Sequence, residues 1–219
     1  MKEIDPEILE NTRVFHVGSL SLTDDPSRTA TYEAINIARN SGAVISYDPN
    51  YRAALWSDPE TAQLRMQSLI PYVDMMKISD EETSLLTPYQ DPEEAIQYLL
   101  RQGVHLVAVT LGRDGALIGN ENGIVKAEGF SSHAVDTTGA GDSFWGGFLA
   151  SYLQEETSPE HLTRAQMIQF GRVGNAVASL CVERRGGISA IPEMEEIEER
   201  LRAVSYTHLR AHETLANLV

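Results

Sequence analysis

The chain has 219 residues, enough to bury the core of one large domain, and its 42% hydrophobic and 22% charged residues are typical of a soluble globular protein. Its 17 basic and 32 acidic residues give a formal net charge of -15, which argues against nonspecific binding to nucleic acid. The single cysteine, Cys181, excludes an internal disulfide and indicates a reducing, cytoplasmic compartment. No apolar run reaches the roughly 18 residues that a membrane helix needs, so a membrane is not an expected partner. The excess of acidic residues means that a nucleic acid is not an expected partner either.

Short apolar runs alternate with amphipathic stretches, a pattern that predicts an α/β fold with a mainly parallel sheet. The runs that we expect to form strands are residues 14–17, 43–47, 73–78 and 105–111. After them, residues 116–118 and 124–127 flank an Asn-Glu-Asn-Gly sequence, and its Asn-Gly pair predicts a hairpin.

Amphipathic stretches and capping residues predict the helices. The expected helices are residues 26–40, 59–69, 92–102, 141–154, 164–182 and 193–204. In the first, Asp24–Pro26 offers an N-cap and a proline at the first helical position, and Gly42 closes the helix. In the third, Asp91 is the cap, Glu94 completes a capping box and Gly103 ends the helix.

The last residues differ from the rest of the chain. Residues 205–219 show no periodicity that continues the helix before them, and they resemble a translated cloning sequence. We therefore expect a nucleotide-binding and catalytic part over residues 1–204 and a non-native tail over residues 205–219.

Residues 136–142 read Asp-Thr-Thr-Gly-Ala-Gly-Asp and stand directly before a helical pattern. Glycines let backbone N–H groups approach a ligand closely, and a helix N-terminus favours anions. A carboxylate repels a bound phosphate, so Asp142 needs a reason to be there. The best reason is that Asp142 takes a proton from a hydroxyl group that attacks the phosphate. The alternative is a glycine-rich turn that only caps a helix.

This string, continued by small residues from Ser143 to Ala150, resembles the C-terminal signature of the ribokinase-like (PfkB) carbohydrate kinases. The resemblance implies a three-layer α/β/α Rossmann-like fold, with ATP and Mg²⁺ as cofactors and a sugar as the acceptor. It also implies that Asp142 is the catalytic base. The backbone N–H groups of Gly139, Ala140 and Gly141 would then form the anion hole.

A second glycine turn follows the strand predicted over residues 105–111, at the end where open α/β sheets bind ligands. Because this turn resembles the family's nucleotide loop, we expect Thr110, Gly112 and Gly115 to contact ATP. Asn175 matches a position near the adenine in these kinases. An ordinary polar residue of a helix is an equal alternative for Asn175.

Two carboxylates resemble residues that the family uses near cations. Ser79 stands where the family often has an asparagine, and Glu82 keeps the carboxylate that would organise the waters of Mg²⁺. A helix start capped by Ser79 is a compatible alternative. Asp136, with the loop over residues 181–192, resembles a site for a monovalent cation such as K⁺.

Residues 48–52, Asp-Pro-Asn-Tyr-Arg, resemble fructokinases, and Arg52 is expected to contact phosphate or sugar oxygens. The alternative is a structural turn with a surface arginine. Fructose is the expected substrate, and 2-keto-3-deoxygluconate, ribose or a nucleoside are alternatives. A dinucleotide-binding oxidoreductase is disfavoured, because its glycine signature would come early in the chain and its acidic residue about 20 positions later.

The resemblance covers residues 13–204, and full-length relatives carry roughly a third of their chain before this point. That part holds the first strand, most sugar-contacting side chains and a small β lid through which relatives often dimerise. We therefore expect an N-terminally truncated kinase whose full-length parent is a homodimer. The chain alone is expected to be an inactive nucleotide-binding fragment.

Overall fold

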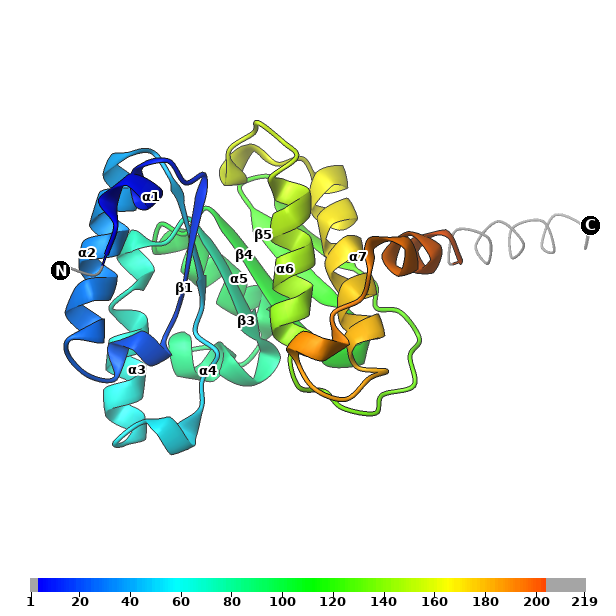
Figure 1. Ribbon diagram of the computed structural model, residues 1–219, viewed down its shortest axis with the longest axis horizontal. Coiled ribbons are helices and arrows are strands. Elements are labelled where there is room, and N and C mark those ends of the chain that lie inside the picture. Colours follow the sequence, from blue (N-terminus) through cyan, green and yellow to red (C-terminus); the bar gives the residue numbers. More distant parts are fainter. Residues whose placement is uncertain (1–3, 204–219) are drawn as a thin grey trace, which may run out of the picture. The chain divides into compact units, whose positions relative to one another are not determined.

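The computed structural model describes residues 4–203 (Figure 1). The chain divides into two compact units. Unit 1 comprises Met1–Leu111, Leu117–Lys126 and Glu156–Met167, and unit 2 comprises Gly112–Ala116, Ala127–Glu155 and Ile168–Val219. The tail predicted over residues 205–219 lies outside the described residues.

Unit 1 is built on a sheet of six strands in the order β1-β2-β3-β4-β5-β6. The strands are β1 (Val14–Gly18), β2 (Val44–Asp48), β3 (Met75–Ser79), β4 (Leu106–Thr110), β5 (Ala116–Asn120) and β6 (Gly123–Ala127). The first four strands pair in parallel. This confirms the prediction of an α/β fold with a mainly parallel sheet, and the chain reverses between β5 and β6 where the hairpin was predicted.

The register of the parallel strands aligns their carboxyl ends. Gly18 pairs with Asp48, and Ser79 pairs with Thr110. Because ligands bind beyond the carboxyl ends of strands in open α/β sheets, the segments that follow β2 and β3 are the places for a site in unit 1.

The helices of unit 1 surround this sheet. They are α1 (Pro6–Glu10), α2 (Ser27–Asn40), α3 (Pro59–Gln67), α4 (Thr83–Leu86) and α5 (Pro92–Arg101). Helix α2 contacts β1 and β2, and α5 contacts β4. The core between helices and sheet contains aliphatic and aromatic side chains that are inaccessible to water, among them Ile35, Ile45, Tyr47, Met66 and Ile96. Their burial is the main source of stability of this unit.

The N-cap predicted at Asp91 is confirmed at α5, and the prediction at α2 is corrected. Asp91 caps α5 and accepts a hydrogen bond from the Glu94 N–H at 3.0 Å. The prediction that Pro26 occupies the first helical position is wrong, because α2 begins at Ser27 and Pro26 is its N-cap residue. The side chain that serves this helix start belongs to Asp25, which accepts from the Thr29 N–H at 3.2 Å.

Unit 2 contains α6 (Ala140–Tyr152), most of α7 (Arg164–Cys181) and a further helical stretch over the described residues 194–203. Trp145 stacks on Phe148 with ring centroids 5.0 Å apart, and Phe148 meets the edge of Phe170 on α7 at 5.7 Å. These rings bind α6 to α7. No helix within residues 4–203 is long and apolar enough to cross a membrane.

Candidate active site

The glycine loop ends at the N-terminus of α6, as predicted. Gly139 is the N-cap residue with a φ of 80°, a left-handed conformation that favours glycine. The Gly141 N–H lies in the first turn, where a helix offers no acceptor for it, so it can donate to an anion. The Ala140 N–H instead donates to the Thr137 carbonyl at 3.2 Å. Of the predicted anion-hole donors, Ala140 is therefore already engaged within the loop, and Asp142 follows in the same first turn.

Asp136 holds this loop to the segment that follows α7. Its Oδ1 accepts from the Thr138 N–H at 2.9 Å, and its Oδ2 accepts from the Gly186 N–H at 3.0 Å. These donors, with Gly186 the stronger influence, lower the pKa of Asp136 to about 2, so the carboxylate is ionised at neutral pH. A side chain on Gly139 would also lie 3.0 Å from the Gly187 Cα atom. Asp136 therefore links the glycine loop to the segment that follows α7 by hydrogen bonds, and its role toward a cation stays a prediction.

A cavity of about 270 Å³ opens beside this loop, and all of its lining residues belong to unit 2. Its surface is mostly apolar. The lining residues are Gly112, Arg113, Gly129, Phe130, Ser132, Ala134, Thr137, Ala140, Asn175, Ala178, Ser179 and Val182. The cavity thus joins an apolar wall to the N-terminus of α6. This combination fits a nucleotide, because the base favours apolar surface and the phosphates favour helix N–H groups.

Two of the residues predicted to contact ATP line this cavity, Gly112 and Asn175. Asn175 is buried, and its Nδ2 donates to the carbonyl oxygens of Ala127 and Glu128. Gly115 has a different role. It has a φ of 96°, and a Cβ atom there would lie 2.1 Å from the Ala127 carbonyl oxygen, so only glycine allows the two segments to pass this closely.

The remaining predicted residues, Arg52, Glu82 and Thr110, lie in unit 1. Glu82 is buried, and both of its carboxylate oxygens accept hydrogen bonds. Its Oε1 accepts from the Tyr51 N–H at 2.8 Å, and its Oε2 accepts from the N–H and hydroxyl groups of Ser79 at 2.8 and 3.0 Å. Glu82 therefore ties the end of β3 to the segment that carries Arg52.

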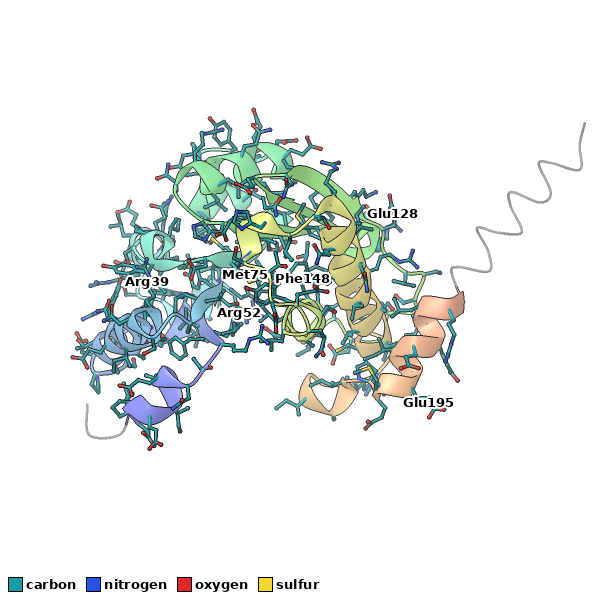
Figure 2. All side chains as sticks on the ribbon, turned by 90° about the horizontal axis from the view of Figure 1, so that it is seen from above. Arg39, Arg52, Met75, Glu128, Phe148 and Glu195 are labelled. Carbon is teal, nitrogen blue, oxygen red and sulfur yellow. The ribbon has the colours of Figure 1, made fainter. Side chains whose placement is uncertain are left out.

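A buried ion pair supports the same segment. The Lys77 Nζ donates to the Asp48 Oδ2 at 2.9 Å, with side chains that are only 6% and 4% exposed. The Asp48 Oδ1 accepts from the Asn50 N–H at 3.1 Å, and Asn50 has a φ of 47°. Arg52 follows this turn on the surface of unit 1, and its Nη1 donates to the Tyr51 carbonyl (Figure 2).

The described side chains do not form a direct metal site. Within residues 4–203, no three His, Cys, Asp or Glu side chains are grouped so that they could hold a metal ion. The oxygens of Glu82 and Asp136 already accept backbone N–H groups. The described side chains therefore form no cluster that binds a metal ion directly, and the predicted roles of Glu82 toward the waters of Mg²⁺ and of Asp136 toward K⁺ stay predictions.

Sequence reasoning missed most of the cavity wall. Asn175 is followed at helical spacing by Ala178, Ser179 and Val182, which line the same face. The spacing i, i+3, i+4 and i+7 with small side chains was visible in the sequence and could have indicated this face. Phe130 lies in a segment without periodicity and gave no such signal. Lys77 was also missed, because its partner Asp48 lies on another strand.

Comparisons with known proteins identify the family and the fold of the chain. The sequence matches the model of the pfkB family of carbohydrate kinases over residues 1–194. It is 35% identical over 191 residues to the Arabidopsis thaliana protein named "Probable fructokinase-2", covering 87% of this chain and 57% of that protein.

Solved structures with the same fold include the Vibrio cholerae O395 fructokinase in its fructose, ADP and calcium ion bound form. It superposes with a TM-score of 0.81 at 30% identity, over 90% of this chain and 64% of that one. The Salmonella enterica aminoimidazole riboside kinase, complexed with aminoimidazole riboside and an ATP analogue, gives 0.77 at 26% identity, over 86% and 62%.

The chain therefore spans about three fifths of the length of these relatives. The family match covers far more than half of the chain, and the fold agrees with it. The chain belongs to the pfkB family of carbohydrate kinases.

Proposed function

We propose that this chain carries the nucleotide-binding and catalytic residues of a kinase that transfers the terminal phosphate of ATP to a hydroxyl group of fructose. The observation that carries the proposal is the cavity of unit 2, which joins an apolar wall to the N-terminus of α6. The first turn of the same helix carries the acid, Asp142. The fructose and ADP named for the Vibrio cholerae relative support the choice of substrates.

The proposed reaction uses the residues of this site in separate roles. The adenine lies against the apolar wall near Asn175, and the phosphates lie at the N-terminus of α6, where the Gly141 N–H and the helix dipole stabilise their charge. Asp142 accepts the proton of the sugar hydroxyl as its oxygen forms a bond to the terminal phosphorus. The bond between that phosphorus and the bridging oxygen breaks, and ADP leaves.

Magnesium enters the proposal only through the nucleotide. Mg²⁺ retains several waters and binds substrate phosphates, and when bound it neutralises their negative charge. Because the described side chains do not form a direct metal site, we assign no step to a protein-bound ion. In unit 1, Arg52 is the proposed contact for phosphate or sugar oxygens, through the planar array of its guanidinium donors.

The experiment measures nucleotide binding and phosphate transfer separately. Calorimetry with ADP tests the cavity, and a coupled assay for ADP release tests transfer to fructose. In a kinase of full family length that contains this chain, Asp142→Asn should keep ADP binding and lower turnover by about 10² to 10⁴, the usual contribution of a positioned base. Absence of ADP binding would refute the nucleotide site. Near-normal turnover in Asp142→Asn would refute the assignment of the base.

A second acceptor is favoured by one comparison. The Salmonella enterica relative is named for a riboside substrate, so a nucleoside-like riboside is the runner-up. Ribose and 2-keto-3-deoxygluconate belong in the same panel. Phosphorylation of one of these in preference to fructose would change the substrate and leave the reaction class intact.

A further inference from the structure

Part of the wall of the unit 2 cavity has no regular secondary structure. Residues 128–134 follow β6 without forming a helix or a strand, and they contribute Gly129, Phe130, Ser132 and Ala134 to the lining. Such a segment lacks the regular backbone hydrogen bonds that hold a helix or a sheet in shape. The shape of this part of the wall is therefore determined by the contacts that the segment makes with its neighbours.

Arg200 joins this wall segment to helix α7. Arg200 belongs to the helical stretch over residues 194–203, none of which lines the cavity. Its Nη1 donates to the Ser131 carbonyl and to the Ser179 hydroxyl, each at 3.2 Å. Ser179 lines the cavity on α7, and the Ser131 carbonyl belongs to the peptide unit before Ser132, which lines it too. One guanidinium group therefore holds two parts of the cavity wall together.

An acidic side chain fixes the orientation of this guanidinium group. The Arg200 Nη2 donates to the Glu183 Oε2 at 2.8 Å, and the two side chains are only 19% and 29% exposed. The donors of arginine form a rigid planar fork. Because Nη2 is bound to the carboxylate, Nη1 is directed at the wall.

Apolar packing connects the same helical stretch to the wall. Phe130 lines the cavity and belongs to the same buried cluster as Ile197, and Leu201 packs against that cluster. The stretch over residues 194–203 thus reaches the wall segment by packing as well as through Arg200. Its position and the conformation of the wall are therefore coupled.

We propose that Arg200 is a positioning residue that holds this cavity wall in the conformation that binds a nucleotide. The inference rests on the proposed function, which places a nucleotide in this cavity. Without the guanidinium group, the Ser131 carbonyl and the Ser179 hydroxyl lose their shared donor, and the wall populates conformations that do not fit the ligand. The observed affinity then falls with the population of the binding conformation. Because Arg200 does not line the cavity, it has no direct part in phosphate transfer.

The test measures ADP binding by calorimetry in buffer containing Mg²⁺, for the wild-type chain and two variants. Arg200→Met keeps an apolar stem and removes every donor, and we expect it to bind ADP about tenfold more weakly. Arg200→Lys keeps the charge beside Glu183 but has no planar fork, so it should also bind ADP more weakly than the wild type. A loss of folded protein lowers the stoichiometry of binding, whereas a displaced wall raises the dissociation constant of the folded fraction.

Arg184→Met is the matched control. Arg184 forms an ion pair with Glu196, so it also links the stretch over residues 194–203 to the segment that follows α7. Neither Arg184 nor Glu196 lines the cavity or bonds to a residue that lines it. This variant should therefore leave the ADP dissociation constant unchanged.

A second measurement needs no substitution. If the wall and the helical stretch over residues 194–203 are coupled, a ligand that selects the ordered wall also stabilises the stretch. ADP should then slow the amide hydrogen exchange of residues 194–203 in the wild-type chain, although none of them lines the cavity. Helix α2 of unit 1 is the internal reference and should exchange at the same rate with and without ADP.

Each result decides the question. Absence of ADP binding to the wild-type chain would overturn the proposed nucleotide site together with this inference. Equal ADP dissociation constants in the wild type and Arg200→Met would overturn the positioning role alone, and so would an equal loss of affinity in Arg184→Met. If the Arg200 variants do not fold, unchanged exchange over residues 194–203 in the ADP-bound wild type would overturn it.

Discussion

Replacement of Lys77 by methionine should destabilise unit 1 strongly. The Lys77 Nζ lies 2.9 Å from the Asp48 Oδ2, and the two side chains are only 6% and 4% exposed. Methionine has a similar volume but no charge, so the substitution leaves a buried carboxylate without its cation. Loss of one partner of a buried ion pair costs about 3 to 5 kcal/mol, and we expect a decrease of this size in the free energy of unfolding.

The two tryptophans of the chain allow this effect to be assigned to one unit. Trp56 is buried in unit 1 and Trp145 is buried in unit 2. In a Trp145→Phe background, fluorescence during urea denaturation reports on Trp56 alone. With an m-value of about 3 kcal/mol/M, Lys77→Met should lower the midpoint of the Trp56 transition by about 1 to 1.7 M urea.

Two further variants make the result decisive. The double variant Lys77→Met with Asp48→Asn removes both charges and should recover part of the stability, because no unpaired charge remains buried. Arg28→Met removes one partner of an exposed ion pair with Asp25 in the same unit and should change the midpoint little. If Lys77→Met shifted the midpoint no more than Arg28→Met, the reasoning from burial would be refuted.

Three further predictions concern residues of the candidate site. Glu82→Gln should lower the free energy of unfolding by about 1 to 3 kcal/mol, because the amide nitrogen of glutamine then faces the Ser79 donors. The substitution should not raise the Mg²⁺ requirement of ADP binding. The pKa of Asp136 is lowered from 3.8 to about 2, so its contribution to stability should be complete above pH 4 and lost as the pH falls to 2, as measured by urea midpoints. Gly115→Ala should cost at least about 2 kcal/mol in urea denaturation, since its Cβ would overlap the Ala127 carbonyl.

Each of these predictions has a control. A raised Mg²⁺ requirement with unchanged stability in Glu82→Gln would assign this carboxylate to the metal instead. Asp136→Asn cannot titrate, so it should lose the part of the pH dependence between 4 and 2, and an unchanged profile would contradict the assignment. Gly146→Ala is the control for Gly115, because its Cβ meets nothing within 4 Å inside α6 and alanine favours helices. Equal effects of the two alanine substitutions would contradict the steric argument.

Much of the fold could be predicted because its signals are local. Asp91 and Glu94 lie three residues apart, so the hydrogen bond from the Glu94 N–H to the Asp91 side chain depends only on the start of the helix and not on distant residues. The buried strand β4 reads Leu-Val-Ala-Val-Thr, an apolar run that is typical of a parallel strand covered on both faces. The prediction failed at Pro26, where Asp25 reaches the Thr29 N–H and the helix begins one residue later than expected.

The sequence by itself determined the family and the position of the glycine loop before α6. The reason is that Asp136–Asp142 is a contiguous motif, so its residue types can be recognised without knowledge of the fold. The tertiary structure alone decided what the polar side chains around it bind. Asp136 meets Gly186, Asn175 meets Glu128 and Lys77 meets Asp48 across sequence separations of 50, 47 and 29 residues. Periodicity and capping report on neighbours within a few residues. Contacts at these separations form only when strands and helices pack, so the partners of Asn175 and the cavity wall emerged from the packing of unit 2.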